Sequence, residues 1–576
     1  MRLSQRVATR VRASLSGPRS PALVALVAVL LSLPALALGF MSDDHILAWQ
    51  LALGDGPWGL FKLTEARLSE LRATGAIAWW ASPRLYVSFF RPLASLSHYV
   101  DFTLWPRAAW LMTLWNVLLY GLAVLFAGLT YRRLTPSPSV AGLAAFMFAV
   151  NEAHGMSVGW ISGRNTVMAL LGSLAALHFH VRARQERRPA FALLSILALG
   201  FGLLSAEAGT WALGLLLAYA LVLEPGSWRA RLVSVGPQLT LGAIWAGVYL
   251  ALGSGVRGTS FYRELSTPFR VLMEGVLDLP LALTSLFGPG VIGFALMSPV
   301  HLARLVALPL AAACVWLVWP SRELREQPSF RFFVAATFAC LPPAFLAIAQ
   351  DRTLIGASFG AFGWIALAID AAARVPGRAA RLRRGALLGL HVFIALPLFL
   401  MNLGSVRRFE NGTQALVGAM EPGREVVLVN TPVELLSDYA FAVLEGPSRP
   451  HPPPLSLHQL YAGTSELWLE RVDARTLDVT ATSGWGRVPF ERIFCPPEDM
   501  PRPGTEVRVR GLLIRVLTAT PEGMPETVRF TFDGAIDAEE RQWLVWEGTT
   551  PVPFTPPAVG QRVRLPPLFV LGALPQ

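Results

Sequence analysis

Asp43 and Asp44 stand directly after an apolar run, residues 21–41, that is long enough to cross a bilayer. A carboxylate inside hydrocarbon costs free energy, so an acidic pair at this place either marks the water interface or does chemistry there. A carboxylate beside the membrane can act as a general base toward a hydroxyl group. The structural alternative is that the pair only caps the start of a helix.

Further polar groups recur in the turns on the same side of the following apolar segments. They are Arg91, Glu152, His154, Arg164, Glu207, Asp351 and Arg352. A guanidinium fits a phosphate group with two parallel hydrogen bonds, which makes the arginines candidate phosphate ligands. The structural alternatives are arginines that extend to lipid headgroups, a buried structural Glu207 and a His154 that only packs. The recurrence on successive turns predicts one polar cavity that opens outward.

The composition is that of a polytopic membrane protein. Of 576 residues, 53% are hydrophobic and only 15% are charged, and the mean hydropathy is +0.48. A soluble domain carries about 25% charged residues. Since a helix needs about 20 apolar residues to cross the bilayer core, the sequence predicts about 11 spans. They are residues 21–41, 110–130, 139–153, 165–181, 189–204, 208–223, 233–252, 302–319, 331–349, 354–373 and 385–403.

The positive charge sets the predicted orientation. Lys62 is the only lysine, and the arginines behind the net charge of +11 gather in short clusters on alternate loops. This positive-inside pattern places the N-terminus in the cytoplasm and the C-terminal region outside. It also argues against a nucleic-acid-binding face, which needs a basic surface on a soluble domain. Residues 270–297 form an interfacial or re-entrant piece, or a hairpin that raises the count to about 13 spans.

Changes in composition predict the domain organisation. The first span is expected to be an uncleaved anchor, because its apolar run exceeds the usual core of a signal peptide. Beyond residue 403, residues 424–446 predict a buried strand, a turn and a helix, and after the linker alternating apolar and polar stretches separated by turn residues predict a small, mostly antiparallel β domain. The predicted parts are a cytoplasmic basic arm (1–20), a transmembrane domain (21–403) with a first outer loop (42–109), a small α/β connecting segment (404–446), a proline-rich linker (447–458) and an extracytoplasmic β-rich domain (459–576).

Several motifs occur in the order found in one family. They are the acidic pair, "FRPLASLS" at 90–97, "LWNVLLY" with Asn116, "NEAHGMSVGWISGR" at 151–164, "SAE" at 205–207 and "DRTLIGASFGAF" at 351–362. Together they resemble the C-type membrane glycosyltransferases, in particular the transmembrane O-mannosyltransferases that carry tetratricopeptide repeats. The resemblance covers roughly residues 20–400.

The sequence also departs from the family pattern. Asn151-Glu152 replaces the family's His-Pro, Met156 its Glu, Thr166 its Asp and Ala206 its Lys. The tetratricopeptide tail is replaced by the β-rich domain. These departures put the donor, the acceptor and the activity itself in question.

The resemblance implies an enzyme of a bacterial inner membrane that transfers a sugar from a polyprenyl-phosphate donor. The acceptor would be a glycan, a lipid or a protein at the outer face. Asp43 or Asp44 would be the general base, or would bind a divalent cation that some relatives use. The donor phosphate would be held by Arg164 and Arg352, and substrate would be bound by Arg91, His154 and Glu207.

Two alternatives stay open. One is a non-catalytic relative that binds a glycolipid or acts in envelope assembly, which the lost positions at Met156 and Thr166 favour. The other is a transporter. The sequence lacks obvious paired halves with broken helices, and this argues against a transporter.

Overall fold

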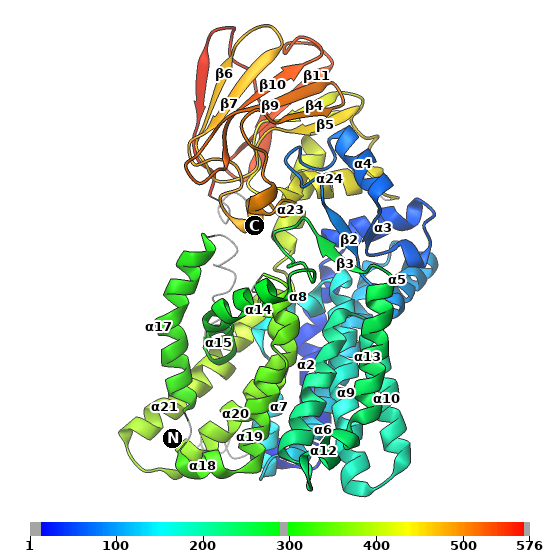
Figure 1. Ribbon diagram of the computed structural model, residues 1–576, viewed down its shortest axis with the longest axis vertical. Helices are drawn as coiled ribbons and strands as arrows, with labels where there is room; N and C mark the ends of the chain where they lie inside the picture. The colour runs from blue at the N-terminus through cyan, green and yellow to red at the C-terminus, as the bar shows by residue number, and fades with distance from the viewer. Residues whose placement is uncertain (1–12, 289–297, 320, 349, 448, 570–576) are drawn as a thin grey trace.

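The computed structural model describes residues 13–288, 298–319, 321–348, 350–447 and 449–569. A helical bundle forms one end of the molecule and two β-sheets form the other (Figure 1). Most of the predicted basic arm, up to residue 12, lies outside the described residues, as does the part of segment 270–297 beyond residue 288.

Every predicted apolar span is largely helical in the structure. The helices of the bundle are α2 (Ser20–Ser32), α6 (Ala109–Leu134), α7 (Pro138–Ala149), α9 (Arg164–Glu186), α10 (Pro189–Leu203), α11 (Trp211–Val222), α12 (Trp228–Ser234), α13 (Gly236–Ala251), α17 (Val300–Val318), α18 (Arg322–Glu326), α19 (Pro328–Ala339), α20 (Ile355–Arg374), α21 (Arg378–Leu388) and α22 (Ala395–Leu403). The fold class predicted from the sequence, a polytopic α-helical membrane protein with a β-rich C-terminal region, is confirmed.

The described helices differ in how much of a bilayer they can cross. By length and composition seven are long enough, or eight if the bent pair α12 and α13 is one span. Three shorter apolar segments, Pro138–Ala149, Pro189–Leu203 and Glu207–Val222, coincide with the remaining predicted spans. A helix rises about 1.5 Å per residue, so a helix as short as α7 reaches only part of the way through a core of about 30 Å.

The arginine-rich helices lie together at one end of the bundle. Figure 1 shows α12, α18 and α21 at the end opposite the β-sheets. This two-sided distribution is the one that the alternating arginine clusters predict. Which side faces the cytoplasm stays a prediction.

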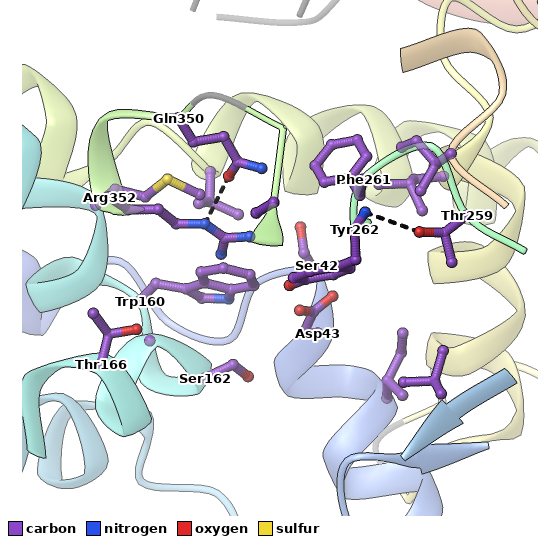
Figure 2. A pocket seen from close by; sticks show the side chains of 18 of the residues that line it. Ser42, Asp43, Trp160, Ser162, Thr166, Thr259, Phe261, Tyr262, Gln350 and Arg352 are labelled. Atoms are coloured by element: carbon purple, nitrogen blue, oxygen red, sulfur yellow. Dashed lines mark hydrogen bonds between the residues drawn. The ribbon is translucent and has the colours of Figure 1, made fainter. Parts of the chain in front are cut away.

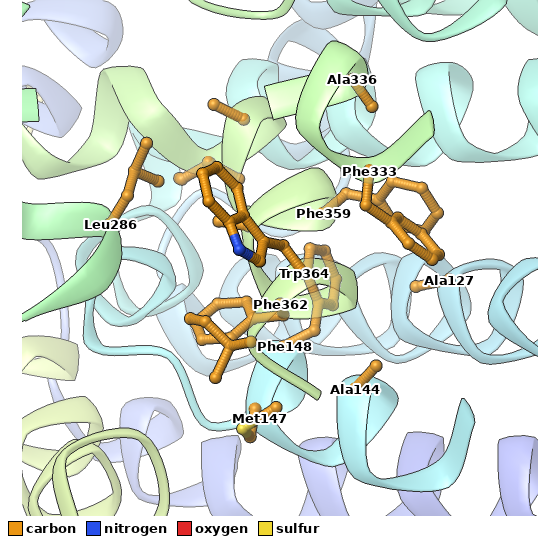
Figure 3. Close-up of a cluster of buried hydrophobic side chains, with 14 of the residues drawn as sticks. Ala127, Ala144, Met147, Phe148, Leu286, Phe333, Ala336, Phe359, Phe362 and Trp364 are labelled. Atoms are coloured by element: carbon orange, nitrogen blue, oxygen red, sulfur yellow. The ribbon is translucent and has the colours of Figure 1, made fainter. Parts of the chain in front are cut away.

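The centre of the bundle is built on α20. In the membrane-span window Asp351–Arg374, 89% of the residues are buried, against 22% in the window of the peripheral α17. Phe359, Phe362 and Trp364 of α20 gather with Phe148 of α7 and Phe333 of α19 (Figure 3). At Gly360 a Cβ atom would lie 2.4 Å from the Thr337 backbone nitrogen, so glycine is what lets α20 approach α19.

Short helices cover the end of the bundle that faces the β-sheets. They are α3 (Asp43–Ala52), α4 (Glu65–Thr74), α5 (Pro92–Leu104), α8 (Glu152–Gly159), α14 (Pro268–Leu277), α15 (Leu279–Phe287), α23 (Arg407–Ala419) and α24 (Leu435–Glu445). Within segment 270–297, the described residues therefore form the two short helices α14 and α15. A small antiparallel sheet joins β2 (Tyr86–Ser88) to β1 (Lys62–Leu63) and β3 (Gly255–Arg257).

Two larger sheets make up the C-terminal region. One is antiparallel, with the order β13-β6-β7-β10-β9-β8, and the other is mixed, with the order β12-β11-β4-β5. The strands are β4 (Glu425–Leu428), β5 (Ser456–Gln459), β6 (Leu467–Arg471), β7 (Thr476–Ala481), β8 (Glu506–Val509), β9 (Leu512–Ala519), β10 (Pro525–Phe532), β11 (Arg541–Glu547), β12 (Thr550–Pro553) and β13 (Arg562–Leu565).

The mixed sheet crosses the predicted domain boundaries. Strand β4 lies in the predicted connecting segment, and β5 begins inside the predicted proline-rich linker. Both pair in parallel with their neighbours, β4 with β11 and β5 with β4. The sequence showed the change in composition, but parallel pairing between distant strands leaves no local signal. We therefore propose one C-terminal unit that begins with α23.

Candidate functional site

A large cavity lies between the helical bundle and the C-terminal region. Its volume is about 1460 Å³, and most of its lining is apolar. The charged and strongly polar side chains that line it are Asp43, Gln50, Lys62, Arg91, Glu152, Glu207, Arg263, Gln350, Asp351, Arg352, Arg408 and Asp438. These residues are far apart in the sequence, so the fold builds the cavity from both ends of the chain.

Asp44 holds the backbone at the start of α3. Its carboxylate accepts hydrogen bonds from the Met41 nitrogen at 2.9 Å, the Ser162 nitrogen at 2.8 Å and the Ser162 hydroxyl. The side chain is fully buried and does not line the cavity. Burial raises the pKa of Asp44 to about 7. The oxygens of Asp44 are thus engaged within the protein, and we do not carry the predicted role of general base to this residue.

Asp43 points into the cavity. Its Oδ1 accepts a hydrogen bond of 2.9 Å from the Tyr439 hydroxyl of α24. Burial raises the pKa of Asp43 above its ordinary value, while the Tyr439 hydrogen bond and the charges of Arg352 and Arg91 oppose that rise. Of the acidic pair, only Asp43 is placed to meet a substrate.

Backbone strain immediately before Asp43 fixes its direction. Ser42 has φ +51°, a conformation that a non-glycine residue rarely adopts. Its backbone nitrogen donates to Glu410 of α23 at 2.9 Å, and Glu410 also contacts His45 at 3.0 Å. Residues from the other end of the chain thus stabilise the turn that aims Asp43 at the cavity.

Arg352 lies in the 3₁₀ turn Asp351–Leu354, directly before α20. Its Nε donates to the Gln350 Oε1 at 2.7 Å, and its guanidinium stands 5.9 Å from the Trp160 ring centroid. Figure 2 shows Arg352 and Asp43 pointing into the same space beside Trp160. Among the described residues, Arg352 forms no ion pair within 4.0 Å, so its charge is available to an anion.

Arg408 of α23 is a further cation on the cavity, and the sequence did not mark it as a candidate. It is exposed, and no hydrogen bond or ion pair joins its guanidinium to another residue in the described ranges. A signal was present in the sequence. Arg407 and Arg408 follow the last span on the predicted outer side, where the positive-inside rule disfavours arginine.

Arg91 and Glu207 line the cavity as a pair. The Arg91 Nε donates to the Glu207 Oε2 at 2.8 Å, and the Arg91 guanidinium lies 3.9 Å from the centroid of the Phe89 ring. Glu207 Oε1 has no hydrogen-bond partner among the described residues. The two predicted substrate-binding residues are therefore brought together at the cavity wall, with the Tyr249 phenol beside the same carboxylate.

Arg164 and His154 lie away from the cavity. Arg164 is 2% exposed, forms an ion pair with Asp101 and donates to Asn116 Oδ1 at 2.9 Å. His154 lies between the Tyr120 hydroxyl at 2.9 Å and the Ser358 hydroxyl at 3.1 Å. The predicted substrate-facing roles of both residues are not supported, because each side chain is already satisfied by internal partners.

Glu152 and Asp351 add two more carboxyl groups to the cavity wall. Burial, together with the nearby charge of Asp351, raises the pKa of Glu152 to about 7. Among the described residues, no three His, Cys, Asp or Glu side chains are grouped so that they could hold a metal ion. We assign no residue to the divalent cation that was considered at Asp43 or Asp44.

Comparisons with known proteins give only distant structural matches. No protein-family model and no curated protein matches the sequence. ArnT from Cupriavidus metallidurans in the apo state matches with a TM-score of 0.41 and 13% identity, over 73% of this chain and 84% of that chain. The same protein bound to undecaprenyl phosphate matches with a TM-score of 0.39 and 14% identity, over 76% of this chain and 89% of that chain.

The apo oligosaccharyltransferase from Archaeoglobus fulgidus matches with a TM-score of 0.39 and 13% identity, over 77% of this chain and 65% of that chain. These solved structures are C-type glycosyltransferases, the class that the sequence resembles. The similarities are distant, and the proposed function is carried by the residues of this chain.

Proposed function

We propose that this chain is a membrane glycosyltransferase that takes a sugar from a polyprenyl-phosphate donor. The sugar passes to a glycan, lipid or protein acceptor at the outer face of a bacterial inner membrane. Asp43 is the general base, and Arg352 and Arg408 hold the donor phosphate. Arg408 takes the place given to Arg164 on the basis of the sequence.

One observation carries this proposal. A carboxylate and an arginine without an ion-pair partner among the described residues face the same large, mostly apolar cavity next to the membrane helices. The apolar lining suits a prenyl chain, the guanidinium suits a phosphate, and the carboxylate suits a hydroxyl proton.

The proposed reaction follows from the positions of these side chains at the cavity. The acceptor hydroxyl oxygen forms a bond to the anomeric carbon of the donor sugar while its proton passes to Asp43. The bond between the anomeric carbon and the phosphate oxygen breaks, and its electron pair stays on the polyprenyl phosphate. Arg352 and Arg408 stabilise the negative charge that develops there.

Binding of the leaving group tests the proposal without knowledge of the sugar. The full-length protein, purified into nanodiscs, should bind undecaprenyl phosphate. Arg352→Gln should weaken this binding about 10- to 100-fold, since hydrogen bonds to charged groups contribute about 1.5–3 kcal/mol. The control is Arg322→Gln, which changes an arginine at the far end of the bundle whose side chain is 89% exposed.

Transfer is then measured with a panel of radiolabelled polyprenyl-phosphate sugars and membranes from a strain that lacks the protein. Incorporation of label that depends on Asp43 is the expected result. Binding of undecaprenyl phosphate without any transfer would favour the non-catalytic, glycolipid-binding alternative. A wild-type protein that does not bind undecaprenyl phosphate would contradict the donor class itself.

A further inference from the structure

Two helices from opposite ends of the chain form one wall of the cavity. Helices α3 and α24 pack against each other. On each helix the cavity-lining residues recur at a spacing of three, four and seven, which is one helical face. They are Asp43, Ile46, Leu47 and Gln50 on α3, and Leu435, Asp438, Tyr439 and Ala442 on α24; Trp49 and Phe441 line the cavity from beside these faces. We call these residues the α3–α24 wall.

The α3–α24 wall carries polar atoms that the described residues leave without partners. Neither carboxyl oxygen of Asp438 is accessible to solvent or accepts a hydrogen bond. Gln50 is 5% exposed; its Nε2 donates to the Lys62 carbonyl at 2.7 Å, and its Oε1 has no partner. Because buried polar groups are nearly always hydrogen-bonded, unsatisfied atoms on residues that line a cavity point to a ligand that completes them.

The chemistry of the missing partner follows from the two groups. Asp438 stands one helical turn after Glu434, and both carboxyl groups are buried. Burial raises the pKa of Asp438 well above its ordinary value, and the neighbouring Glu434 adds to that rise. A neutral carboxylic acid offers one O–H donor and one acceptor oxygen, and the Gln50 Oε1 offers a second acceptor. A hydroxyl group can both donate and accept a hydrogen bond, so the hydroxyl groups of a ligand suit both Asp438 and Gln50.

We propose that the α3–α24 wall binds the hydroxyl groups of a glycosyl unit, with Asp438 and Gln50 as its hydrogen-bonding residues. This inference deepens the proposed function and rests on it. Tyr439 of the same wall donates to Asp43, so a glycosyl unit bound there lies beside the base. The glycosyl unit belongs either to the donor or to the acceptor, and the chemistry of recognition is the same for both.

Direct binding separates these two sources. The probes for full-length protein in nanodiscs are undecaprenyl phosphate, its mannosyl and glucosyl esters, and the octyl glycosides of the same two sugars. Asp438→Ala and Gln50→Ala should each weaken at least one sugar-bearing probe about tenfold and leave undecaprenyl phosphate unchanged. Loss confined to the esters assigns the wall to the donor, and loss confined to the octyl glycosides assigns it to the acceptor.

Two further variants guard against a merely structural effect. Asp438→Asn keeps a donor and an acceptor in nearly the same shape, so it should retain binding that Asp438→Ala loses. Asp533→Ala is the matched control, because Asp533 lies in an exposed ion pair with Arg508 and does not line the cavity. The ligand-free Asp438→Ala protein should melt no lower than the wild type, since it loses a buried group without a partner.

The inference would be overturned if both alanine variants bound every sugar-bearing probe as tightly as the wild type does. It would also be overturned if the wild type bound the glycosyl esters no more tightly than undecaprenyl phosphate and did not bind the octyl glycosides. A lower melting temperature of Asp438→Ala without its ligand would also count against it. If the wild type binds the octyl glycosides through Asp438 but not undecaprenyl phosphate, the donor proposal fails and the glycosyl site stands.

Discussion

Asp44 accepts three hydrogen bonds inside the protein, whereas Asp43 accepts one from Tyr439 and faces the cavity. Adjacent residues on a helix point about 100° apart, so an acidic pair at a helix start cannot serve one site with both side chains. The acidic pair thus divides into a residue that shapes the turn and a residue that can react.

Substitution of each aspartate by asparagine tests this division. Asp43→Asn should lower turnover about 10²–10⁴-fold, because it removes the proton acceptor while the fold is kept. Asp44→Asn should instead lower stability by about 1–3 kcal/mol, because one of its acceptor oxygens becomes a donor facing other donors. Sugar transfer and thermal unfolding in nanodiscs are the measurements. Equal turnover of Asp43→Asn and wild type would remove Asp43 from the reaction.

The pH dependence of transfer tests the role of Tyr439. The hydrogen bond from Tyr439 lowers the pKa of Asp43, against the larger effect of burial. Removing it in Tyr439→Phe should raise that pKa, so a higher pH is needed to ionise the base. The acidic limb of the rate profile should move to higher pH, while the rate on the alkaline side of that limb is less affected. An acidic limb at the wild-type pH would show that the base is not in contact with Tyr439.

At this scale the sequence identified residue types better than residue roles. The motifs marked Asp43, Arg91, Glu207 and Arg352, and all four line the cavity. The same motifs marked Arg164, whose internal ion pair with Asp101 depends on a contact that local sequence does not reveal. Asp438 and Tyr439 were missed for the converse reason, since only the packing of α24 on α3 brings them to the site.

Single helices position the reactive groups in this fold. Arg352 precedes α20, the most buried of the candidate spans, so the place of its guanidinium depends on how α20 packs. At Gly360 a Cβ atom would meet the backbone of α19, and the neighbouring atom is a backbone nitrogen that cannot rotate away.

Gly360→Ala should therefore disturb the site from a distance. The added Cβ would lie 2.4 Å from the Thr337 nitrogen, and overpacking of this kind costs about 1–3 kcal/mol. We expect a lower melting temperature and weaker undecaprenyl phosphate binding, measured on the same nanodisc samples. Gly385→Ala is the control, because no atom lies within 4 Å of the Cβ position there. Equal melting temperatures of the two variants would show that α20 has room to move.

Elements were predictable where their signal is local. Apolar blocks of about 20 residues predicted the helices, and the alternation of apolar and polar residues predicted the antiparallel strands β9 and β10. The sequence predicted the strand β4 but not its parallel pairing with β11, and it assigned β5 to a linker, because the partners of both strands lie elsewhere in the chain. A short strand in a proline-rich stretch has no periodicity that distinguishes it from an extended linker.

The whole molecule has two chemically different ends, and they predict its orientation in the membrane. The arginine-rich helices α12, α18 and α21 lie opposite the β-sheets, and arginine clusters stay in the cytoplasm. Alkaline phosphatase fused after residue 420 should be active, and the same enzyme fused after residue 188 should be inactive. The reverse pair of results, at equal protein levels, would invert the topology and place the cavity on the other side.

The hydrogen bond between Tyr439 and Asp43 joins residues 396 positions apart in the chain. Ribosomes make Asp43 early, and the phenol that contacts it emerges only after every membrane helix has been synthesised. A nascent chain therefore has Asp43 but lacks Tyr439, and helix α24, which lines the cavity, has not yet been made. Under the proposed function, we expect transfer only when translation of the C-terminal region is complete, so a half-made protein in the membrane would not consume the lipid-linked sugar pool.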